Sequence, residues 1–323
     1  MTPTLLETVT TRANPQIDPV LHVWGWEIVL YLFLGGIVAG IFVLVGALEF
    51  ASGEKPRSHP LRLMPFVALG LLSLGMLALW LDLAHRFWAW RFYAAFRPTS
   101  PMSWGAWILV LIYPAGLLLG LGGLDDGQRG WLRAKTPRFL LALLEKLVAW
   151  GDAWRRPLLF LNVVMGVGLG LYTGLLLGTM PSRLAWNSAV LGPLFLASGV
   201  STGAALLLLL TLDEGERKTL VRWDAVAIGA EIILIGLLFV GFATSGETGR
   251  YAAGLFLGGP YTAVFWSLVF VMGLLVPLVI EGLEARRHLP FVVLAPVLIL
   301  AGGLALRWIL LSAGLYSAFR LLP

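Results

Sequence analysis

The chain has 323 residues, of which 59% are hydrophobic and only 13% are charged, and its mean hydropathy is +0.86. A water-soluble protein of this size could not bury so much apolar surface, so the composition excludes that class and predicts a polytopic membrane protein. The pI of 9.7 raises the question of nucleic-acid binding. Basic loops on one side of a membrane explain this pI better, and we expect no nucleic-acid partner.

Eight apolar segments are each long enough to cross a hydrocarbon core of roughly 30 Å as a helix. We therefore predict an all-α integral membrane protein with eight transmembrane helices, arranged as two four-helix bundles in a single domain covering residues 1–323. The predicted helices are Trp24 to Phe50, Leu63 to Leu83, Trp104 to Leu121, Leu158 to Leu177, Val190 to Leu210, Ala225 to Ala243, Tyr261 to Ile280 and Pro290 to Leu311.

Basic residues are distributed unequally between the two sets of connecting loops. The side that holds both termini carries 7 Lys and Arg residues, and the other side carries 15. The positive-inside rule makes the richer side cytoplasmic and both termini periplasmic. Residues 1–23 are then a periplasmic segment, and we expect no cleavage there because they lack the pattern of a secretory signal.

The connection at residues 124–156 holds a candidate interfacial helix. In "RFLLALLEKLVAWGDAWRR" the apolar residues fall on one helical face and the charged residues on the other. This pattern predicts an amphipathic helix lying flat at the cytoplasmic membrane surface. The segments at 31–40 and 193–203 resemble each other, and their small residues fit either close helix packing or a site.

Residue types exclude several cofactors from this protein. There is no cysteine, so a cysteine-ligated iron-sulfur cluster cannot be held here. The four histidines lie near segment ends or in loops, so no two can face each other in mid-membrane to ligate a b-type haem. We expect no metal site, no haem and no iron-sulfur cluster.

The stretch "LWLDLAHRFWAWRFY" at 79–93 ends an apolar segment with more polar groups than a helix end requires. On a continuous helix Asp82 and His85 would share a face, and Asp82 and Arg86 could form an ion pair. The pair Asp82 and His85 could give and take protons near neutral pH. The alternative is that Asp82 only neutralises Arg86 at the headgroup level.

Other polar and aromatic residues are expected at the same outer edge and could form one pocket with Asp82. Their flat, apolar walls suit a quinone ring, although tryptophans also gather at membrane interfaces whatever the function. The candidate contacts are Glu27, Trp24, Trp88, Trp104, Tyr172, Ser198 and Arg307.

Glu231 lies about six residues inside the sixth predicted helix, on the cytoplasmic half. A carboxylate inside a membrane costs about 2.5 to 3.5 kcal/mol, so it needs a partner or a proton. It could be a packed, protonated acid, or it could form one step of a proton route with Glu49 and Asn162.

The sequence resembles the NrfD/polysulfide reductase membrane-subunit family, and the nitrite-reductase NrfD branch in particular. The resemblance rests on "VWGWEIVLYLFLGGIVAG", "LDLAHRFW", "SPMSWGAWIL", "LGLYTGLLL", "LFLASGVSTGAAL", "AEIILIGLLFVG", "FWSLVFVMGLLVPLVI" and "LALRWILLSAG". It covers all eight predicted helices. Many relatives carry "DLGRP" where this sequence has Asp82 followed by "LAHRF", and their closing "AGQ" appears here as "AGL".

The resemblance implies a subunit that exchanges electrons between menaquinol or ubiquinol and a ferredoxin-like iron-sulfur subunit. That partner would serve a catalytic subunit, either a molybdopterin enzyme or a multihaem cytochrome. It also implies a quinone pocket at the edge that holds Asp82 and His85, in the cytoplasmic membrane of a bacterium or archaeon. Two alternatives stay open, a transporter or proton channel and a purely structural anchor.

Overall fold

The computed structural model describes residues 24–53, 58–83, 85–180, 183–211, 213–287 and 292–317. The predicted periplasmic segment 1–23 lies outside these ranges. The described residues form helices joined by short connections and contain no β-strand. The helices long and apolar enough to cross a membrane are α2 (Trp26–Ser52), α3 (His59–Asp82), α5 (Pro101–Gly123), α8 (Arg155–Gly178), α9 (Leu191–Leu210), α10 (Glu214–Thr244), a seventh span at Thr262–Glu284, and α14 (Leu294–Tyr316).

The seventh span is built from three consecutive elements. These are α12 (Thr262–Val264), the π-helix η2 (Phe265–Leu275) and α13 (Val276–Arg287). With it the described residues contain eight membrane-spanning helices, as predicted from the sequence. Shorter elements connect the spans: η1 (Arg86–Trp88), α4 (Arg91–Ala94), α6 (Asp126–Lys135), α7 (Arg138–Ala153) and α11 (Gly246–Phe256).

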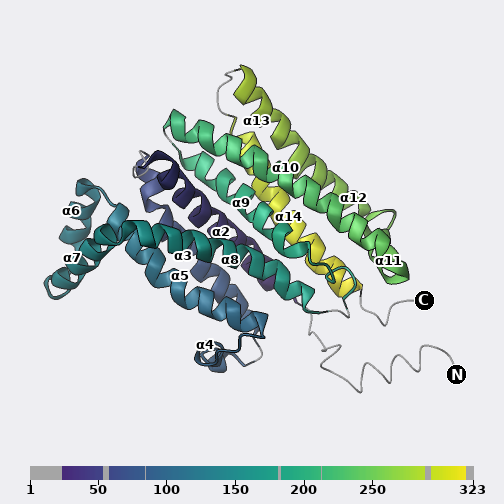
Figure 1. Cartoon of the computed structure of the whole chain (residues 1–323), viewed down its shortest axis with the longest axis horizontal. Coiled ribbons are helices and arrows are strands. Elements are labelled where there is room, and N and C mark those ends of the chain that lie inside the picture. The colour runs from purple at the N-terminus through teal and green to yellow at the C-terminus, as the bar shows by residue number, and fades with distance from the viewer. Residues whose placement is uncertain are drawn as a thin grey trace.

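The spans pack as two groups of four in chain order (Figure 1). In the first group α2 packs on α3 and α8, and α5 closes the group by packing on both of them. In the second group α9 packs on α10 and α14, and the seventh span packs on both of these. The predicted arrangement as two four-helix bundles is confirmed, and the two bundles meet where α9 packs on α2 and α8.

The contact between α2 and α9 is made by the two glycine-containing segments that resemble each other in sequence. A methyl group on Gly40 would overlap the carbonyl oxygen of Gly199, and one on Gly203 would lie 2.7 Å from Gly40 Cα. A methyl group on Gly199 would lie 2.8 Å from the carbonyl oxygen of Gly36. The glycines are therefore needed for close backbone approach, as in other membrane helix pairs. We call this contact the α2–α9 seam.

Helix α10 is longer than the sequence predicts. It begins at Glu214, whereas hydropathy predicted a start at Ala225. Its N-cap is Asp213, whose side chain accepts a hydrogen bond from the backbone N–H of Glu216 (2.9 Å). At 1.5 Å per residue Glu231 lies about 26 Å along this helix, so the estimate of six residues from its start was wrong. Glu231 instead lies near the middle of α10.

The predicted amphipathic helix is present as α7, and α6 precedes it (Figure 1). Asp125 starts α6 with a capping box, because its carboxylate accepts the Gln128 backbone N–H and the Gln128 side chain accepts the Asp125 backbone N–H. Helix α7 packs on α5 through a close contact of Gly151 with Gly122. Its position at the membrane surface stays a prediction.

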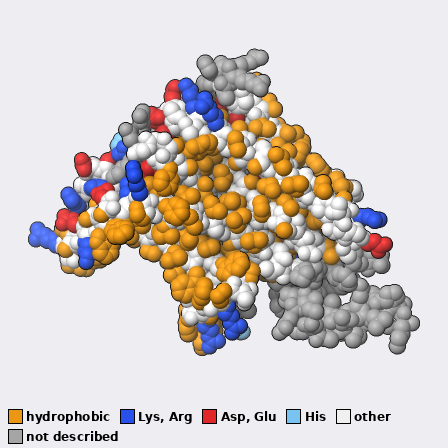
Figure 2. All heavy atoms as spheres, in the orientation of Figure 1, with side chains coloured by type: hydrophobic (Ala, Val, Ile, Leu, Met, Phe, Trp, Pro, Cys, Tyr) orange, Lys and Arg blue, Asp and Glu red, His pale blue; other side chains and the backbone are white. Residues whose placement is uncertain are grey.

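The outer surface is mostly apolar. Figure 2 shows hydrophobic side chains covering the face of both bundles, with charged side chains gathered at their ends and around α6 and α7. Large apolar side chains on the spans are strongly exposed, among them Phe160 (65%), Val226 (71%) and Trp308 (61%). Such a belt is what a lipid-facing surface requires.

Candidate functional site: an outer acidic edge and an inner polar chain

Helix α3 ends at Asp82, and this changes the geometry predicted for the cluster at the end of the second span. Leu83 already has an extended backbone, and His85 precedes the short helix η1. Asp82 and His85 therefore do not share a helical face. Arg86 donates through Nη2 to the Leu81 carbonyl (2.7 Å), and among the described residues no ion pair joins it to Asp82. Both expectations based on helical spacing were wrong, because no continuous helix links these residues.

Asp82 has a different neighbour, Glu27, in the first turn of α2. The two carboxyl groups lie close enough to interact electrostatically. This proximity follows from the packing of α2 on α3, which brings the start of one antiparallel helix to the end of the other. Asp82 is partly exposed, so the pair lies at the edge of the bundle rather than inside it. The structure thus brings together two of the predicted acids.

A group of tyrosines lies beside this acidic edge. Tyr31 on α2 and Tyr172 on α8 are buried, and their side chains are electrostatic neighbours. Gly105 makes room for this pair, since a methyl group there would overlap the Tyr172 ring. Tyr93 on α4 is an electrostatic neighbour of both, and burial together with nearby Tyr113 raises the pKa of Tyr93. We call Glu27, Asp82, Tyr31, Tyr172 and Tyr93 the outer cluster.

Among the predicted tryptophan contacts Trp24 is partly buried, whereas Trp88 (52%) and Trp104 (42%) are exposed. Trp24 stacks on Trp186 with ring centroids 5.4 Å apart, and buried Trp186 donates to the Leu310 carbonyl (2.8 Å). Trp104 donates to the Pro98 carbonyl (2.7 Å). His85 and Trp88 are exposed, and the Arg91 guanidinium lies 4.0 Å from the Trp88 ring centroid. Trp88 and His85 therefore lie on the surface beside the outer cluster.

Ser198 and Arg307 are not part of this edge. Arg307 is fully buried on α14 and donates through Nη1 to Ser198 Oγ (3.0 Å) and to the Gly303 carbonyl (2.8 Å). Its Nε donates to the Leu32 carbonyl (3.3 Å), six residues beyond the start of α2 and next to Tyr31. Gly36 leaves the space for the guanidinium, because a methyl group there would lie 2.5 Å from Nη2. The seam glycines thus serve close packing and an arginine site together.

A chain of buried polar groups continues from Arg307 between α9 and α10. Ser198 and Glu231 line the same small cavity, and Glu231 is an electrostatic neighbour of Arg307. Ser201 donates to Asp224 Oδ1 (2.7 Å). The spacing explains the alignment, since residues three apart on α9 and seven apart on α10 each return to one face. The partner that Glu231 lacks on its own helix is therefore supplied by α9 and α14.

This series of groups ends at a second pair of carboxyl groups. Asp224 is fully buried and is an electrostatic neighbour of Glu281 on α13, which is 2% exposed. Among the described residues neither Glu281 oxygen nor Asp224 Oδ2 has a hydrogen-bonding partner. Two negative charges placed together in a buried site repel, so a pair of this kind favours holding a proton. We call Arg307, Ser198, Glu231, Ser201, Asp224 and Glu281 the inner chain.

A small cavity lies along the inner chain. It is lined on one side by Ser198, Ser201, Thr202 and Glu231, and on the other by residues of η2 and α14. The volume open to the centre of a water-sized sphere is about 10 Å³. This is the lower limit for one water, and the polar lining offers enough hydrogen-bonding partners for it.

The other two residues of the predicted proton route lie in the first bundle. Glu49 forms a two-pronged ion pair with Arg155, to Nε and to Nη2 (2.6 Å), near the end of α2. Asn162 is fully buried and donates to the Leu158 carbonyl (2.8 Å). Within the described ranges no interaction joins either residue to Glu231.

Sequence reasoning missed Asp224 and Glu281. Asp224 precedes the predicted sixth helix by one residue, and Glu281 follows the predicted seventh helix by one. Both fell in predicted loops because hydropathy places a span's limits where polar residues begin. The N-cap signal of Asp213, with acidic residues in the first turn after it, could have extended the sixth helix and placed Asp224 inside it. No comparable signal extends the seventh.

The described residues contain no group of three His, Asp or Glu side chains arranged to hold a metal ion. The polar sites described above consist of carboxyl, hydroxyl, phenol and guanidinium groups, all of which can form hydrogen bonds.

Comparison with known proteins reveals relatives that match along nearly the whole sequence. The profile described as "Polysulphide reductase, NrfD" matches residues 13–318. "Protein NrfD" of Escherichia coli is 33% identical over 306 residues, covering 90% of this protein and 95% of that one. A protein named as one of the chains of polysulfide reductase, from Wolinella succinogenes, is 31% identical over 310 residues, covering 90% and 94%.

A more distant relative carries another substrate in its name. It is named as a subunit of selenate reductase, from Mesobacillus selenatarsenatis, and is 25% identical over 315 residues, covering 89% of this protein and 72% of that one. The profile match covers all eight spans, and the two nearer relatives each match 90% of this protein. This protein therefore belongs to the polysulphide reductase NrfD family of multi-pass membrane proteins.

Proposed function

We propose that this protein is the membrane anchor subunit of a multi-subunit oxidoreductase, and that it oxidises quinol at the outer cluster. Support comes from the family and from relatives named as parts of polysulfide and selenate reductases. The observation that carries the quinol site is the meeting of Glu27 and Asp82 at one membrane edge beside the buried pair Tyr31 and Tyr172.

This arrangement fits the chemistry of a quinol. Oxidation of a quinol releases two electrons and two protons, so the site needs two proton acceptors and a route outward for the electrons. Glu27 and Asp82 are two carboxylates at an edge open to water, and each accepts one proton. Exposed His85 passes protons from Asp82 to the solvent. Tyr172, beside Tyr31, donates a hydrogen bond to one ring oxygen.

The aromatic residues position the ring in this proposal. Trp24, held against Trp186, and Trp104, held by its bond to Pro98, present rigid faces near the ends of α2 and α5. Trp88 covers the exposed side. The substrate is menaquinol or ubiquinol, and the electrons pass to a ferredoxin-like iron-sulfur partner and then to a molybdopterin or multihaem catalytic subunit.

We also propose the membrane and the orientation. The protein resides in the cytoplasmic membrane of a bacterium or archaeon, with both termini and the outer cluster on the periplasmic side. The basic asymmetry of 15 to 7 supports this, because the positive charges gather at the opposite end.

The inner chain adds a second function, proton movement. Glu281 and Asp224 receive a proton from the cytoplasmic side, Ser201 and the water-sized cavity lead it to Glu231, and Ser198 and Arg307 link it to the carbonyl of Leu32 beside the outer cluster. Support comes from the buried polar groups along this path, namely the hydrogen bonds from Ser201 to Asp224 and from Arg307 to Ser198 and to the Leu32 carbonyl, and from the small cavity beside Glu231. A role for Glu49 and Asn162 in the same movement stays a prediction.

The deciding experiment is purification of the tagged protein from its native membrane under mild conditions. We expect stoichiometric iron-sulfur and catalytic subunits, identified by mass, and quinol-dependent reduction of the iron-sulfur partner. A protein that purifies without partners and moves a solute across liposomes would establish the alternative, a transporter. A complex that assembles but neither binds nor oxidises quinol would show that this protein is a purely structural anchor.

A further inference from the structure

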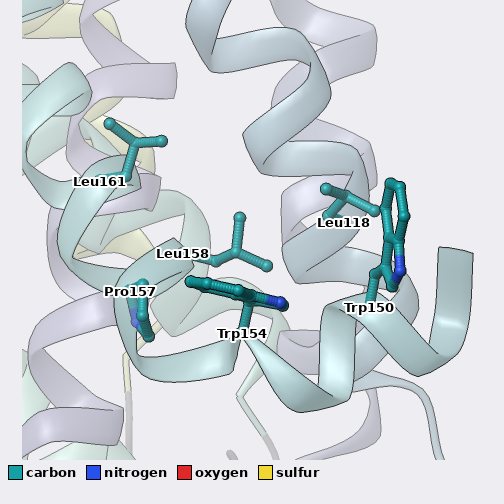
Figure 3. A pocket seen from close by; sticks show the side chains of 6 residues that line it. All are labelled: Leu118, Trp150, Trp154, Pro157, Leu158 and Leu161. Atoms are coloured by element: carbon teal, nitrogen blue, oxygen red, sulfur yellow. The ribbon is translucent and has the colours of Figure 1, made fainter.

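A groove on the basic side of the molecule has no part in the proposed quinol site. It lies between α5, α7 and α8, has a volume of about 470 Å³ and is lined by Leu118, Trp150, Trp154, Pro157, Leu158 and Leu161. In Figure 3 Leu118 and Trp150 form one wall, Pro157, Leu158 and Leu161 form the other, and the Trp154 ring lies between them. Every lining side chain is apolar apart from the two indole N–H groups.

The groove lies at the depth of the first carbons of a lipid tail. Leu118 is five residues before the end of α5, and Leu161 is six residues after the start of α8. At 1.5 Å per residue the groove therefore extends within about 9 Å of the helix ends. Helix α7 crosses at that level and supplies Trp150, so the groove opens where the hydrocarbon core meets the polar surface.

The rim of the groove is positively charged. Lys146 Nζ lies 5.1 Å from the ring centroid of Trp150, which is one turn away on α7 and lines the groove. Arg156 is exposed and precedes Pro157 in the sequence. Among the described residues neither cation has an ion pair, whereas neighbouring Arg155, Arg129 and Arg133 pair with Glu49, Asp152 and Glu145.

We propose that the groove binds one anionic glycerophospholipid of the leaflet on the basic side of the molecule. One acyl tail fills the apolar groove, the phosphate lies at Lys146 and Arg156, and the Trp150 and Trp154 N–H groups donate to the ester region. The positive rim favours an anionic headgroup over a zwitterionic one. The isoprenoid tail of a quinol is a poorer match, because the outer cluster lies at the opposite ends of the helices.

The test is native mass spectrometry of the full-length protein released from detergent, with dioleoyl phosphatidylglycerol or dioleoyl phosphatidylcholine added at matched concentrations. We expect tighter retention of the phosphatidylglycerol. Lys146→Gln should weaken that lipid about fivefold, the loss expected for one cation near an anionic headgroup, and should leave phosphatidylcholine unchanged. Leu161→Trp should fill the groove and weaken both lipids.

Two control variants make the result specific. Lys135→Gln removes an exposed cation from α6, away from the groove, and Phe160→Trp alters an exposed side chain next to Leu161 that does not line it. Both should bind lipid like the parent protein, and all variants should unfold at the parent temperature.

The proposal fails if phosphatidylglycerol shows no preference over phosphatidylcholine, or if each control lowers retention as much as its partner variant. Retention of a quinone or a peptide in place of phospholipid would also overturn it. The readout does not involve electron transfer, so it stands apart from the proposed quinol oxidation.

Discussion

Ser201 on α9 donates a 2.7 Å hydrogen bond to Asp224 on α10, and both side chains are at most 1% exposed. A buried carboxyl group with a fixed donor on one oxygen is held in one orientation. Its second oxygen, Oδ2, has no hydrogen-bonding partner among the described residues, and the Glu281 carboxyl group is its electrostatic neighbour. Asp224 and the neighbouring Glu281 form the end of the inner chain that is nearest the basic side of the molecule.

Glu231→Gln tests whether the inner chain moves protons. The amide keeps the size and most hydrogen bonds of the acid but cannot release a proton, so we expect fewer protons moved per electron in liposomes. Quinol oxidation should fall less than proton movement. The control is Glu145→Gln, which alters an exposed acid on α7. An unchanged ratio together with unchanged turnover would exclude a route through Glu231.

Asp82→Asn tests the outer cluster. Amide and carboxylate have nearly equal volume, so the complex should assemble with a normal subunit ratio. We expect quinol oxidation to slow by about 10²-fold or more, the range typical of a lost general base. Asp126→Asn, an exposed acid in the first turn of α6, provides the control. Normal turnover in a well-assembled Asp82→Asn complex would limit Asp82 to a structural role.

Gly40→Ala and Gly35→Ala make a matched pair at the α2–α9 seam. The added methyl group overlaps a backbone carbonyl at Gly40, but meets nothing within 4 Å at Gly35. We expect Gly40→Ala to destabilise the protein by about 1–3 kcal/mol, the usual cost of overpacking. Gly35→Ala should be neutral or slightly stabilising, since it restricts the unfolded state. Thermal unfolding in one detergent compares them, and equal midpoints would contradict the backbone contact.

Asp125 makes the anchoring of α6 dependent on pH. The backbone N–H of Gln128 and then the contacts from His59 Nδ1 (2.7 Å) and Arg62 (3.6 Å) lower the pKa of this carboxyl group. The ionised Asp125 carboxylate contributes fully to the free energy of unfolding above the unfolded-state pKa of about 3.9. This contribution is lost as pH falls through the lower folded-state pKa.

The measurement is hydrogen exchange of the α6 backbone amides between about pH 5 and pH 2, the range that brackets this titration, corrected for intrinsic rates. Protection should decline toward the acid end in the parent protein. Asp125→Asn should keep the N-cap, since Asn also caps helices, and should remove most of this decline. A decline of equal size in the variant would assign the pH dependence to another group.

The eight spans could be predicted from the sequence because each needs only a long apolar segment. Where a span continues into polar residues, the prediction stopped too early. Helix α10 begins eleven residues before Ala225, so Asp224 was placed outside the helix that buries it. Hydropathy measures the preference for lipid, whereas a helix end depends on caps and packing.

The candidate site was predicted only in part, because its geometry also depends on where helices end and on how they pack. Glu27 and Asp82 could be named, since acids near apolar segments are costly, and packing brings them together. The partnership of Asp82 with His85 assumed a helix that in fact ends at Asp82, and no Gly or Pro marks that end in the sequence. Arg307 was expected at the outer edge, but its neighbours on α2 and α9 could not be known without the seam.

The seam also limits how the molecule can move. Packed helices slide past each other when their side chains change rotamers, and transporters that alternate access rock one bundle against the other. At Gly36, Gly40, Gly199 and Gly203 backbone meets backbone, so there are no side chains whose rearrangement could allow such sliding. Sliding of one bundle on the other would have to break these backbone contacts at the α2–α9 seam. A proton route of the kind we propose needs only side-chain rotations and proton transfers, so it can operate without such sliding.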